Sequence, residues 1–232
     1  MTTGGVAERV ARVQDTIARA CERAGRARQE VRLVAVTKQQ SLARIRAAHA
    51  AGLRVFGENR VQEAEGKRPE LPDDVEWHLV GPLQSNKVRR AVDTFRVVHA
   101  VDRPKIAILL DREAGERGLR LDGFLEVNLG EEPAKHGFSP RGFLDTVAPL
   151  ADLGHLRLVG LMAISPLEND PERTRLWFRR LRDLRDRLVE HPAWAGCPGR
   201  LSMGMSDDFD LAISEGATDV RVGTALFGPR EG

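Results

Sequence analysis

The stretch VRLVAV at residues 31–36 decides the fold class of this chain. It is almost entirely apolar and rich in β-branched valine, which is typical of a strand buried in a parallel sheet. Seven further candidate strands follow, at spacings long enough for a crossover helix. Eight alternating units favour a closed (β/α)8 TIM barrel over an open sheet. The eight predicted strands end near Val36, Gly57, Val80, Ala100, Val127, Leu161, Ser202 and Val222.

Helical patterns surround these strands. An amphipathic pattern over residues 6–27 predicts an extra N-terminal helix ahead of a barrel that spans residues 31–228. A second helix is expected from Ser41 as its N-cap. The clearest helix follows the sixth strand, with Asp170 as its N-cap and Pro171 in its first turn. Its arginines are expected to be solvated rather than to bind RNA, and its apolar face is expected to contain Trp177, Leu181, Leu184 and Leu188.

The composition excludes several classes of protein. The chain has 232 residues, 41% of them hydrophobic, and shows no linker, so one domain over residues 1–232 is expected. A net charge of +2 gives no basic field for nucleic acid, and Cys21 and Cys197 have no spacing typical of disulfides or metal sites. The start of the chain lacks the apolar core of a secretory signal and no later run has membrane-spanning length, so a cytoplasmic protein is expected.

Lys38 is the first candidate for chemistry. It follows the first strand by two residues, and functional groups of parallel barrels lie where the strands end. A partly desolvated amine has a lowered pKa and can attack an aldehyde, which arginine cannot do. Only five of the 36 basic residues are lysines, so a lysine retained at a strand end is informative. An ordinary surface lysine remains the alternative.

The second candidate is the glycine-containing turn after the last strand. Gly223 and Thr224 follow that strand directly, and such turns expose backbone N–H groups to an anion such as phosphate. An ordinary helix start, capped by Thr224, is the alternative. Ser206 lies at the end of the seventh strand and is expected to cap the next helix. Because Asp207 and Asp208 are close to it, Ser206 ranks below the Gly223 turn as a phosphate contact.

Two further residues lie near strand ends. Asn59 either faces the mouth of the barrel or caps a helix. His78 lies inside a strand, where a hydrogen-bonded core histidine is the common alternative to a functional one. No group of His, Cys and acidic residues has ligand spacing, so no metal is expected.

With these residues in place, the chain resembles the YggS/PROSC family, the pyridoxal 5′-phosphate (PLP) homeostasis proteins. The resemblance runs from about Val31 to Gly228 and rests on five motifs in the same order. They are AVTK (35–38), FGEN (56–59), WH with GPLQSNK (77–87), LSMGMS (201–206) and RVGT with FG (221–228).

The resemblance implies the fold of the PLP-binding domain of alanine racemase, of fold type III, and PLP as the cofactor. The family pattern, applied to the matching positions of this chain, implies that Lys38 forms the aldimine and that Arg221 contacts the pyridine nitrogen. Gly223, Thr224 and Ser206 would hold the phosphate, while Asn59, His78 and Met205 would line the pocket. The chain departs from the family at the rim, where Gln39, Gln40 and Arg60 replace a common lysine, proline and tyrosine.

The expected function is PLP binding for intracellular vitamin B6 homeostasis, without dedicated turnover. An arginine partner leaves the pyridine nitrogen unprotonated, which weakens the electron sink of PLP. The resemblance implies that racemases of this fold combine the barrel with a β domain, which supplies a tyrosine or cysteine as the acid or base opposite the lysine. This sequence has no tyrosine and ends five residues after Phe227, so no second acid or base is expected opposite Lys38.

Three alternatives stay open. The first is an amino-acid racemase of low activity, and the second is an aldolase-type barrel in which Lys38 forms an imine with a sugar phosphate. The third is a non-catalytic interaction scaffold. The expected partners are PLP, amino acids and PLP-dependent apo-enzymes, with no nucleic acid and no membrane, and the protein is expected to be a monomer.

Overall fold

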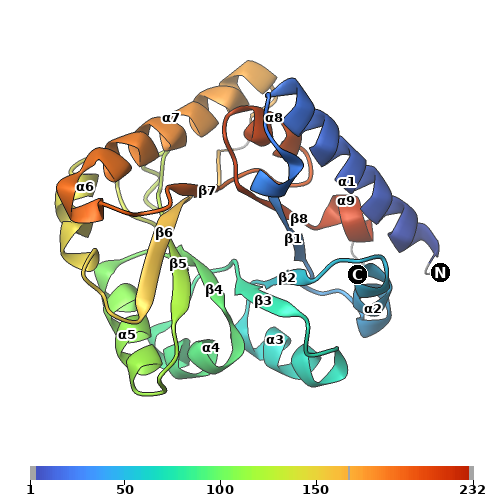
Figure 1. Cartoon of the computed structure of the whole chain (residues 1–232), viewed down its shortest axis with the longest axis horizontal. Helices are drawn as coiled ribbons and strands as arrows, with labels where there is room; N and C mark the ends of the chain where they lie inside the picture. Colours follow the sequence, from blue (N-terminus) through green and yellow to red (C-terminus); the bar gives the residue numbers. More distant parts are fainter. Residues whose placement is uncertain (1–3, 167, 230–232) are drawn as a thin grey trace.

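The structure is a computed structural model that describes residues 4–166 and 168–229. Within these residues, eight parallel strands pair in chain order and the last pairs with the first, so the sheet closes into a barrel (Figure 1). The strands are β1 (Arg32–Val36), β2 (Val55–Glu58), β3 (Glu76–Leu79), β4 (Val97–Val101), β5 (Leu121–Glu126), β6 (Leu156–Met162), β7 (Arg200–Ser202) and β8 (Asp219–Val222). The (β/α)8 barrel is confirmed, and every predicted strand end lies within one residue of the observed end.

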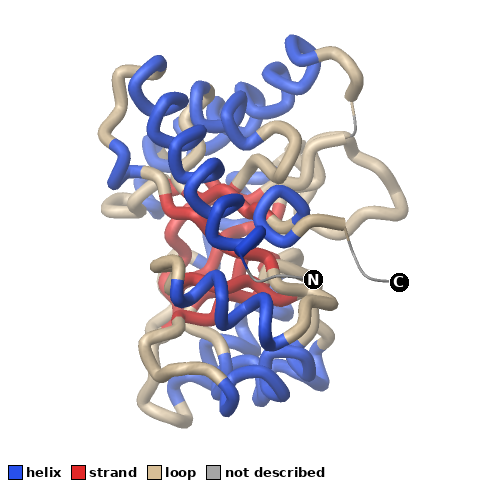
Figure 2. The backbone as a smooth tube through the Cα atoms, turned by 90° about the vertical axis from the view of Figure 1, so that its right-hand side faces the viewer, coloured by secondary structure: helices blue, strands red, loops and turns tan. Residues whose placement is uncertain are grey.

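The helices surround the strands, as the side view in Figure 2 shows. They cover the outer face of the barrel, where the main hydrophobic core lies. A smaller apolar cluster around Phe124 fills part of the interior. The described α-helices are α1 (Gly4–Arg23), α2 (Leu42–Ala50), α3 (Val61–Lys67), α4 (Val88–Thr94), α5 (Pro104–Gly115), α6 (Phe143–Val147), α7 (Pro171–Glu190), α8 (Phe209–Ser214) and α9 (Thr224–Phe227).

The extra N-terminal helix is confirmed but ends earlier than predicted. Helix α1 stops at Arg23, because Gly25 has φ of 64° and turns the chain away. The N–H of Gly25 donates to the carbonyl of Glu22 at 3.0 Å, and that of Arg26 donates to the carbonyl of Cys21 at 2.9 Å. These two bonds satisfy carbonyls that the helix end leaves open. The apolar face of α1 packs against α8 and α9 at the barrel wall (Figure 1).

Helix α7 begins as predicted but buries a different aromatic residue. Asp170 is its N-cap and accepts a hydrogen bond from the N–H of Glu172 at 2.9 Å. The predicted apolar face was wrong at Trp177, which is half-buried and has the Arg180 guanidinium 4.6 Å above its ring. Phe178 occupies the core position instead, because it lies three residues from Leu181 and closer to the middle of the buried stripe.

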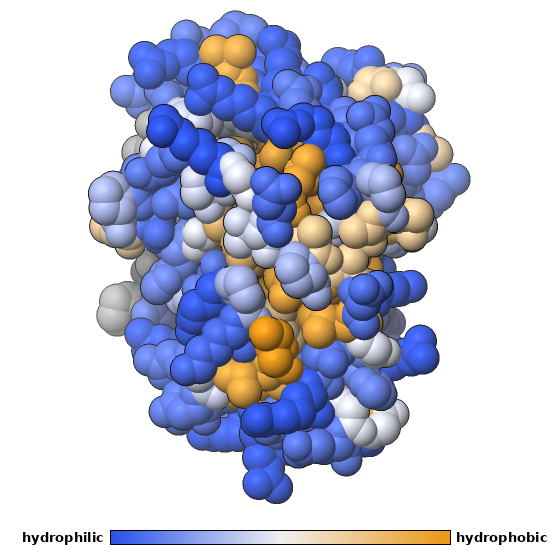
Figure 3. All heavy atoms as spheres, turned by 90° about the vertical axis from the view of Figure 1, so that its left-hand side faces the viewer, coloured by the Kyte–Doolittle hydropathy of each residue, from blue (hydrophilic) through white to orange (hydrophobic). Residues whose placement is uncertain are grey.

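The surface is mostly polar. Figure 3 shows one face on which hydrophobic atoms form patches bordered by hydrophilic residues. No helix in the described part of the chain combines the length and apolar character needed to cross a membrane. The large hydrophobic side chains that are exposed belong to Ile108, Ile164, Leu176 and Met205.

Candidate functional site

The two sequence candidates, Lys38 and the Gly223 turn, lie on neighbouring strands. The register pairs Val34 with Arg221, so the end of β1 and the end of β8 are adjacent. A side chain at Gly223 would begin 3.4 Å from the carbonyl oxygen of Val36, which places the turn in van der Waals range of the end of β1. Lys38 follows Val36 by two residues and is half-buried. Barrel closure therefore brings the candidate amine next to the candidate anion site.

The Gly223 turn forms a cradle of hydrogen-bond donors around Ser206. The hydroxyl oxygen of Ser206 accepts from the N–H groups of Gly223 and Ala225, each at 3.2 Å. Two amides and a hydroxyl therefore converge beside the exposed Thr224 side chain, a donor set that suits a phosphate group.

The predicted role of Ser206 as a helix cap was wrong. Asp208 is the N-cap residue of α8, and its carboxylate accepts from the N–H of Met205 at 2.6 Å. Ser206 instead turns across to the β8 turn, because two N–H groups there lack acceptors within their own short helix. The Met205 amide is thus engaged, while its side chain is 41% exposed. Ser206 and the Gly223 turn are therefore joined by hydrogen bonds, and their ranking as phosphate contacts stays a prediction.

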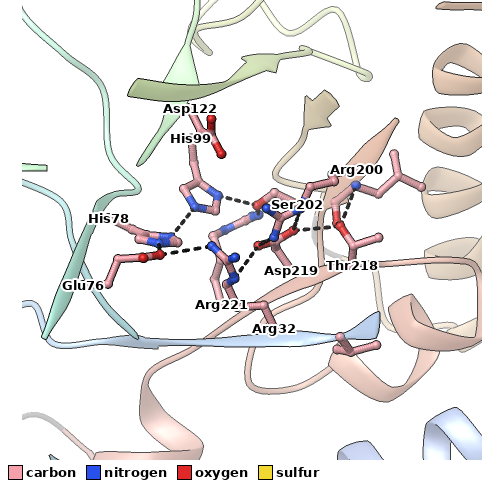
Figure 4. Close-up of polar contacts among 12 residues, drawn as sticks. Arg32, Glu76, His78, His99, Asp122, Arg200, Ser202, Thr218, Asp219 and Arg221 are labelled. Carbon is pink, nitrogen blue, oxygen red and sulfur yellow. Dashed lines mark hydrogen bonds and ion pairs between the residues drawn. The ribbon is translucent and has the colours of Figure 1, made fainter. Parts of the chain in front are cut away.

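Arg221 projects into the barrel interior below this cradle. Its guanidinium donates to the hydroxyl oxygen of Ser202 at 2.6 Å and to the carbonyl of Ala163 at 3.0 Å (Figure 4). Burial lowers the pKa of Arg221 to about 10, which leaves it charged at neutral pH. A guanidinium has five N–H donors, so further donors remain for a ligand above it.

His78 is fully buried within the barrel rather than open at its mouth. Its ring contacts His99 and Glu76, and it reaches Arg221 only through His99 and Ser202 (Figure 4). His78 therefore lies deeper in the barrel than any ligand that Arg221 would contact. Sequence reasoning missed His99 and Ser202, because nothing in the local pattern shows which strands face each other across a barrel.

A buried ion pair supports the segment that carries Lys38. The ammonium of Lys67 donates to the Glu58 carboxylate at 2.7 Å and to the Thr37 carbonyl at 2.9 Å. The Thr37 hydroxyl donates to the same carboxylate oxygen of Glu58 at 2.6 Å. Burial raises the pKa of Glu58, and the bonds from Lys67 and Thr37 act against that rise. The scarcity of lysine was a signal that could have drawn attention to Lys67 as well as to Lys38.

Glu126 is a second titratable group that sequence reasoning missed. It ends β5, which lies opposite β1 in an eight-stranded barrel, and it lies two residues after the interior residue Phe124, on the same face of the strand. One of its carboxylate oxygens is buried without a hydrogen-bond partner. Burial and the neighbouring carboxylate of Asp102 raise the pKa of Glu126 to about 7, although Arg221 acts to lower it. The site therefore holds an ionisable carboxyl on the side away from the lysine.

A cleft of about 910 Å³ opens beside the ends of β2, β3 and β4. Asn59 and Arg60 line it, together with Lys87, Asp102 and Arg103. Of the three residues that depart from the family pattern, Arg60 therefore lines this cleft. Among the residues that the structure describes, no group of three His, Cys, Asp or Glu side chains is placed to hold a metal ion.

The fold and the site together define a class: an alanine-racemase-type barrel with a lysine just after β1 and a hydrogen-bonded pair of turns after β7 and β8. The profile described as "Alanine racemase, N-terminal domain" matches residues 10–231. An alanine racemase of Corynebacterium glutamicum superposes with a TM-score of 0.73 at 18% identity, covering 96% of this chain and 62% of the racemase. That likeness concerns the fold.

Closer relatives define the family within this class. The pyridoxal phosphate homeostasis protein of Pseudomonas aeruginosa is 44% identical over 227 residues, which cover 97% of this chain and 96% of that protein. PipY of Synechococcus elongatus, solved with PLP bound, is 41% identical with a TM-score of 0.84, covering 96% of this chain and all of that one. This chain belongs to the pyridoxal phosphate homeostasis protein family.

Proposed function

We propose that this protein binds PLP reversibly and serves its homeostasis, holding and releasing the cofactor without dedicated turnover. The observation that carries the proposal is the cradle of Ser206, Gly223 and Ala225 beside the end of β1 that bears Lys38. The PLP-bound structure of the relative PipY supports it, as do the names of the relatives as homeostasis proteins.

The residues present fit each part of PLP. Two amides, the Ser206 hydroxyl and Thr224 suit the phosphate, and the buried guanidinium of Arg221 suits the pyridine nitrogen. The amine of Lys38 would condense with the aldehyde to give an imine and one water, and the reverse reaction releases the cofactor. When bound, PLP supplies an electrophilic aldehyde and an electron-withdrawing ring.

The expected setting is the cytoplasm, where the two thiols stay reduced. Burial raises the pKa of both Cys21 and Cys197, so neither is an activated nucleophile. We infer that the chain acts as one domain and as a monomer. Its further partners would be amino acids, which exchange with the lysine at the aldehyde, and PLP-dependent apo-enzymes.

The test combines spectroscopy with mass spectrometry. Adding PLP to the purified protein is expected to give near-visible imine absorbance, and borohydride is expected to fix one phosphopyridoxyl group on the peptide that contains Lys38. Lys38→Ala should lose both signals, while the matched variant Lys105→Ala, at an exposed position, should keep them. An adduct on another lysine, or absorbance that survives in Lys38→Ala, would refute the proposal.

A low-activity racemase is the second candidate, and Glu126 is the observation that favours it. A buried carboxyl with a pKa of about 7, on the strand opposite Lys38, can exchange a proton near neutral pH. The test is exchange of the α-hydrogen of alanine in deuterated water. Exchange that depends on both Lys38 and Glu126 would favour the racemase, whereas its absence in the PLP-loaded protein supports the carrier.

A further inference from the structure

A row of hydrogen-bonded side chains crosses the barrel interior, from Arg221 near the mouth to Glu76 at the opposite end (Figure 4). Arg221 donates to the Ser202 hydroxyl at 2.6 Å, and that hydroxyl lies 2.7 Å from Nδ1 of His99. Nε2 of His99 lies 2.9 Å from Nδ1 of His78, whose Nε2 lies 2.8 Å from the Glu76 carboxylate. Four strands, β8, β7, β4 and β3, contribute to this row.

The groups at the two ends of the row fix the donor-to-acceptor direction of its hydrogen bonds. The guanidinium of Arg221 only donates, so Ser202 accepts from it and has its own proton available for Nδ1 of His99. His99 then donates from Nε2 to His78, and His78 donates from Nε2 to the carboxylate of Glu76. The direction requires that both rings be neutral and carry their proton on Nε2.

The surroundings favour this neutral state. Burial lowers the pKa of both histidines, and for His99 the nearby cations Arg221, Arg200 and Arg32 lower it further. On His78, the carboxylates of Glu76 and Asp219 oppose the effect of burial. A proton added to His99 would therefore place a positive charge, away from solvent, near the cations Arg32, Arg200 and Arg221 of β1, β7 and β8.

Packing fixes the rings in position. The His99 ring stacks on Phe124 with centroids 4.6 Å apart, and the His78 ring lies 5.1 Å from His99. Glu76 is held at its end by Arg32 at 3.1 Å, and its side chain is 41% exposed. The row therefore has a rigid buried middle and one end in contact with solvent.

We propose that Ser202, His99 and His78 are positioning residues that orient the guanidinium of Arg221 toward its ligand, with Glu76 as the terminal acceptor across the barrel. The row engages Nη1 of the guanidinium and the carbonyl of Ala163 accepts from Nη2, so the remaining N–H donors can serve a ligand. This role rests on the proposed function, in which that ligand is the pyridine nitrogen of PLP. It makes the electrostatics of the cofactor site depend on a carboxylate at the far end of the barrel.

The first test needs no cofactor. In the ligand-free protein with ¹⁵N-labelled histidine, His78 and His99 are expected to be neutral, with their protons on Nε2, between pH 6 and 8. Single His→Gln variants assign the signals. A proton on Nδ1, or a cationic ring at either position, would refute the proposed direction of the row, whether or not the protein binds PLP.

The second test measures how the row affects the affinity for PLP and the pH dependence of the bound absorbance. Ser202→Ala removes the link between Arg221 and His99 and is expected to weaken PLP binding at least tenfold and to shift the pH midpoint of the bound absorbance. Ser202→Thr keeps the hydroxyl and is expected to stay within about threefold of wild type. Glu76→Gln should shift the same midpoint, and Asp122→Asn, which pairs with Arg157 at the same end of the barrel, should not.

The two proposals fail in different ways. Loss of the borohydride adduct on Lys38 refutes PLP binding by that amine, while the NMR signature of the histidines is unaffected. If Ser202→Ala forms the adduct with wild-type affinity for PLP and an unshifted pH midpoint, positioning of Arg221 by the row is refuted. Should Ser202→Ala not fold, the Glu76→Gln and Asp122→Asn pair decides by the same measurements.

Discussion

At the scale of single residues, the mouth of the barrel depends on a few ionisable groups taken out of water. Lys67 donates to the carbonyl of Thr37, the residue before Lys38 in the chain, and a planar guanidinium would not make the same bonds as its compact ammonium. Glu58 and Glu126 are buried carboxyls whose pKa values burial raises. Whether each carries charge at neutral pH depends on its neighbours. Glu58 is paired with Lys67, whereas Glu126 has one buried oxygen without a hydrogen-bond partner and lies near the charges of Asp102 and Arg221.

The raised pKa of Glu126 predicts a loss of stability as pH rises. Because the folded state binds the proton more tightly than the unfolded state, its contribution is full below about pH 4.5 and is lost through pH 7. Glu126→Gln cannot ionise, so at pH 8 it should be more stable than wild type by up to about 3 kcal/mol, and at pH 4 the two should be similar. Urea unfolding at both pH values measures this, with the exposed Glu8→Gln as control. Equal stability at pH 8 would contradict the prediction.

The Lys67–Glu58 pair predicts a large effect of removing one partner. Lys67→Met leaves the Glu58 carboxylate buried without its cation, which is expected to cost about 3 kcal/mol. The loss should be smaller at pH 5 than at pH 8, because Glu58 can then take up a proton. Adding Glu58→Gln to Lys67→Met should restore part of the stability, and Lys105→Met should change little. A Lys67→Met variant as stable as wild type would exclude the pair as a support for Lys38.

At the scale of elements, strand positions were predictable and helix contacts were not. Strands such as β1 and β4 are short apolar runs, and β7 and β8 are followed by glycine-containing turns, so their ends are visible in the sequence. The buried side of α7 was partly misjudged, because Trp177 and Phe178 both fit a helical period and only packing chooses between them. The arginines of α7 were expected to be solvated, whereas Arg175, Arg179 and Arg182 converge on Glu215 at the end of α8.

That convergence predicts that Glu215 ties α7 to α8. Burial acts to raise its pKa, yet the hydrogen bonds and charges of the three arginines lower it overall. Glu215→Gln should therefore destabilise the protein by about 1–3 kcal/mol at pH 7, with the difference shrinking as pH falls below about 4.5. Glu172→Gln, an exposed partner of Arg175, is the control and should have little effect on urea unfolding. A similar loss in both variants would show that Glu215 has no special role.

At the scale of the whole molecule, barrel closure creates the site. Pairing of β8 with β1 brings Lys38 beside the Gly223 turn, although the two lie at opposite ends of the chain. Helix α1 covers α8 and α9 next to that junction, and so buries apolar surface where the barrel closes. Among the described residues, the large exposed hydrophobic ones are Ile108 on α5, Leu176 on α7, and Ile164 and Met205 in the loops after β6 and β7. They are thus divided between outer helices and loops at the mouth rather than gathered on a single helix or strand.

A monomer is therefore the expected state in solution. Light scattering coupled to gel filtration should give a mass near 25.7 kDa, unchanged by PLP and by salt. A concentration-dependent mass near twice that value would contradict the prediction. Ile164→Ser and Met205→Ser, at the ends of β6 and β7, would then show whether the mouth of the barrel is the contact.

The sequence alone determined the barrel, the strand ends, the lysine after β1 and the glycine turn after β8, because these depend on local periodicity and on residues close together in the chain. Tertiary structure decided which polar groups meet inside. The bond between His99 and Ser202 joins residues 103 positions apart, and Ser206 contacts amides 17 and 19 positions away. Desolvation, which sets the charge of Glu126 and of the two histidines, likewise exists only after the strands have closed around them.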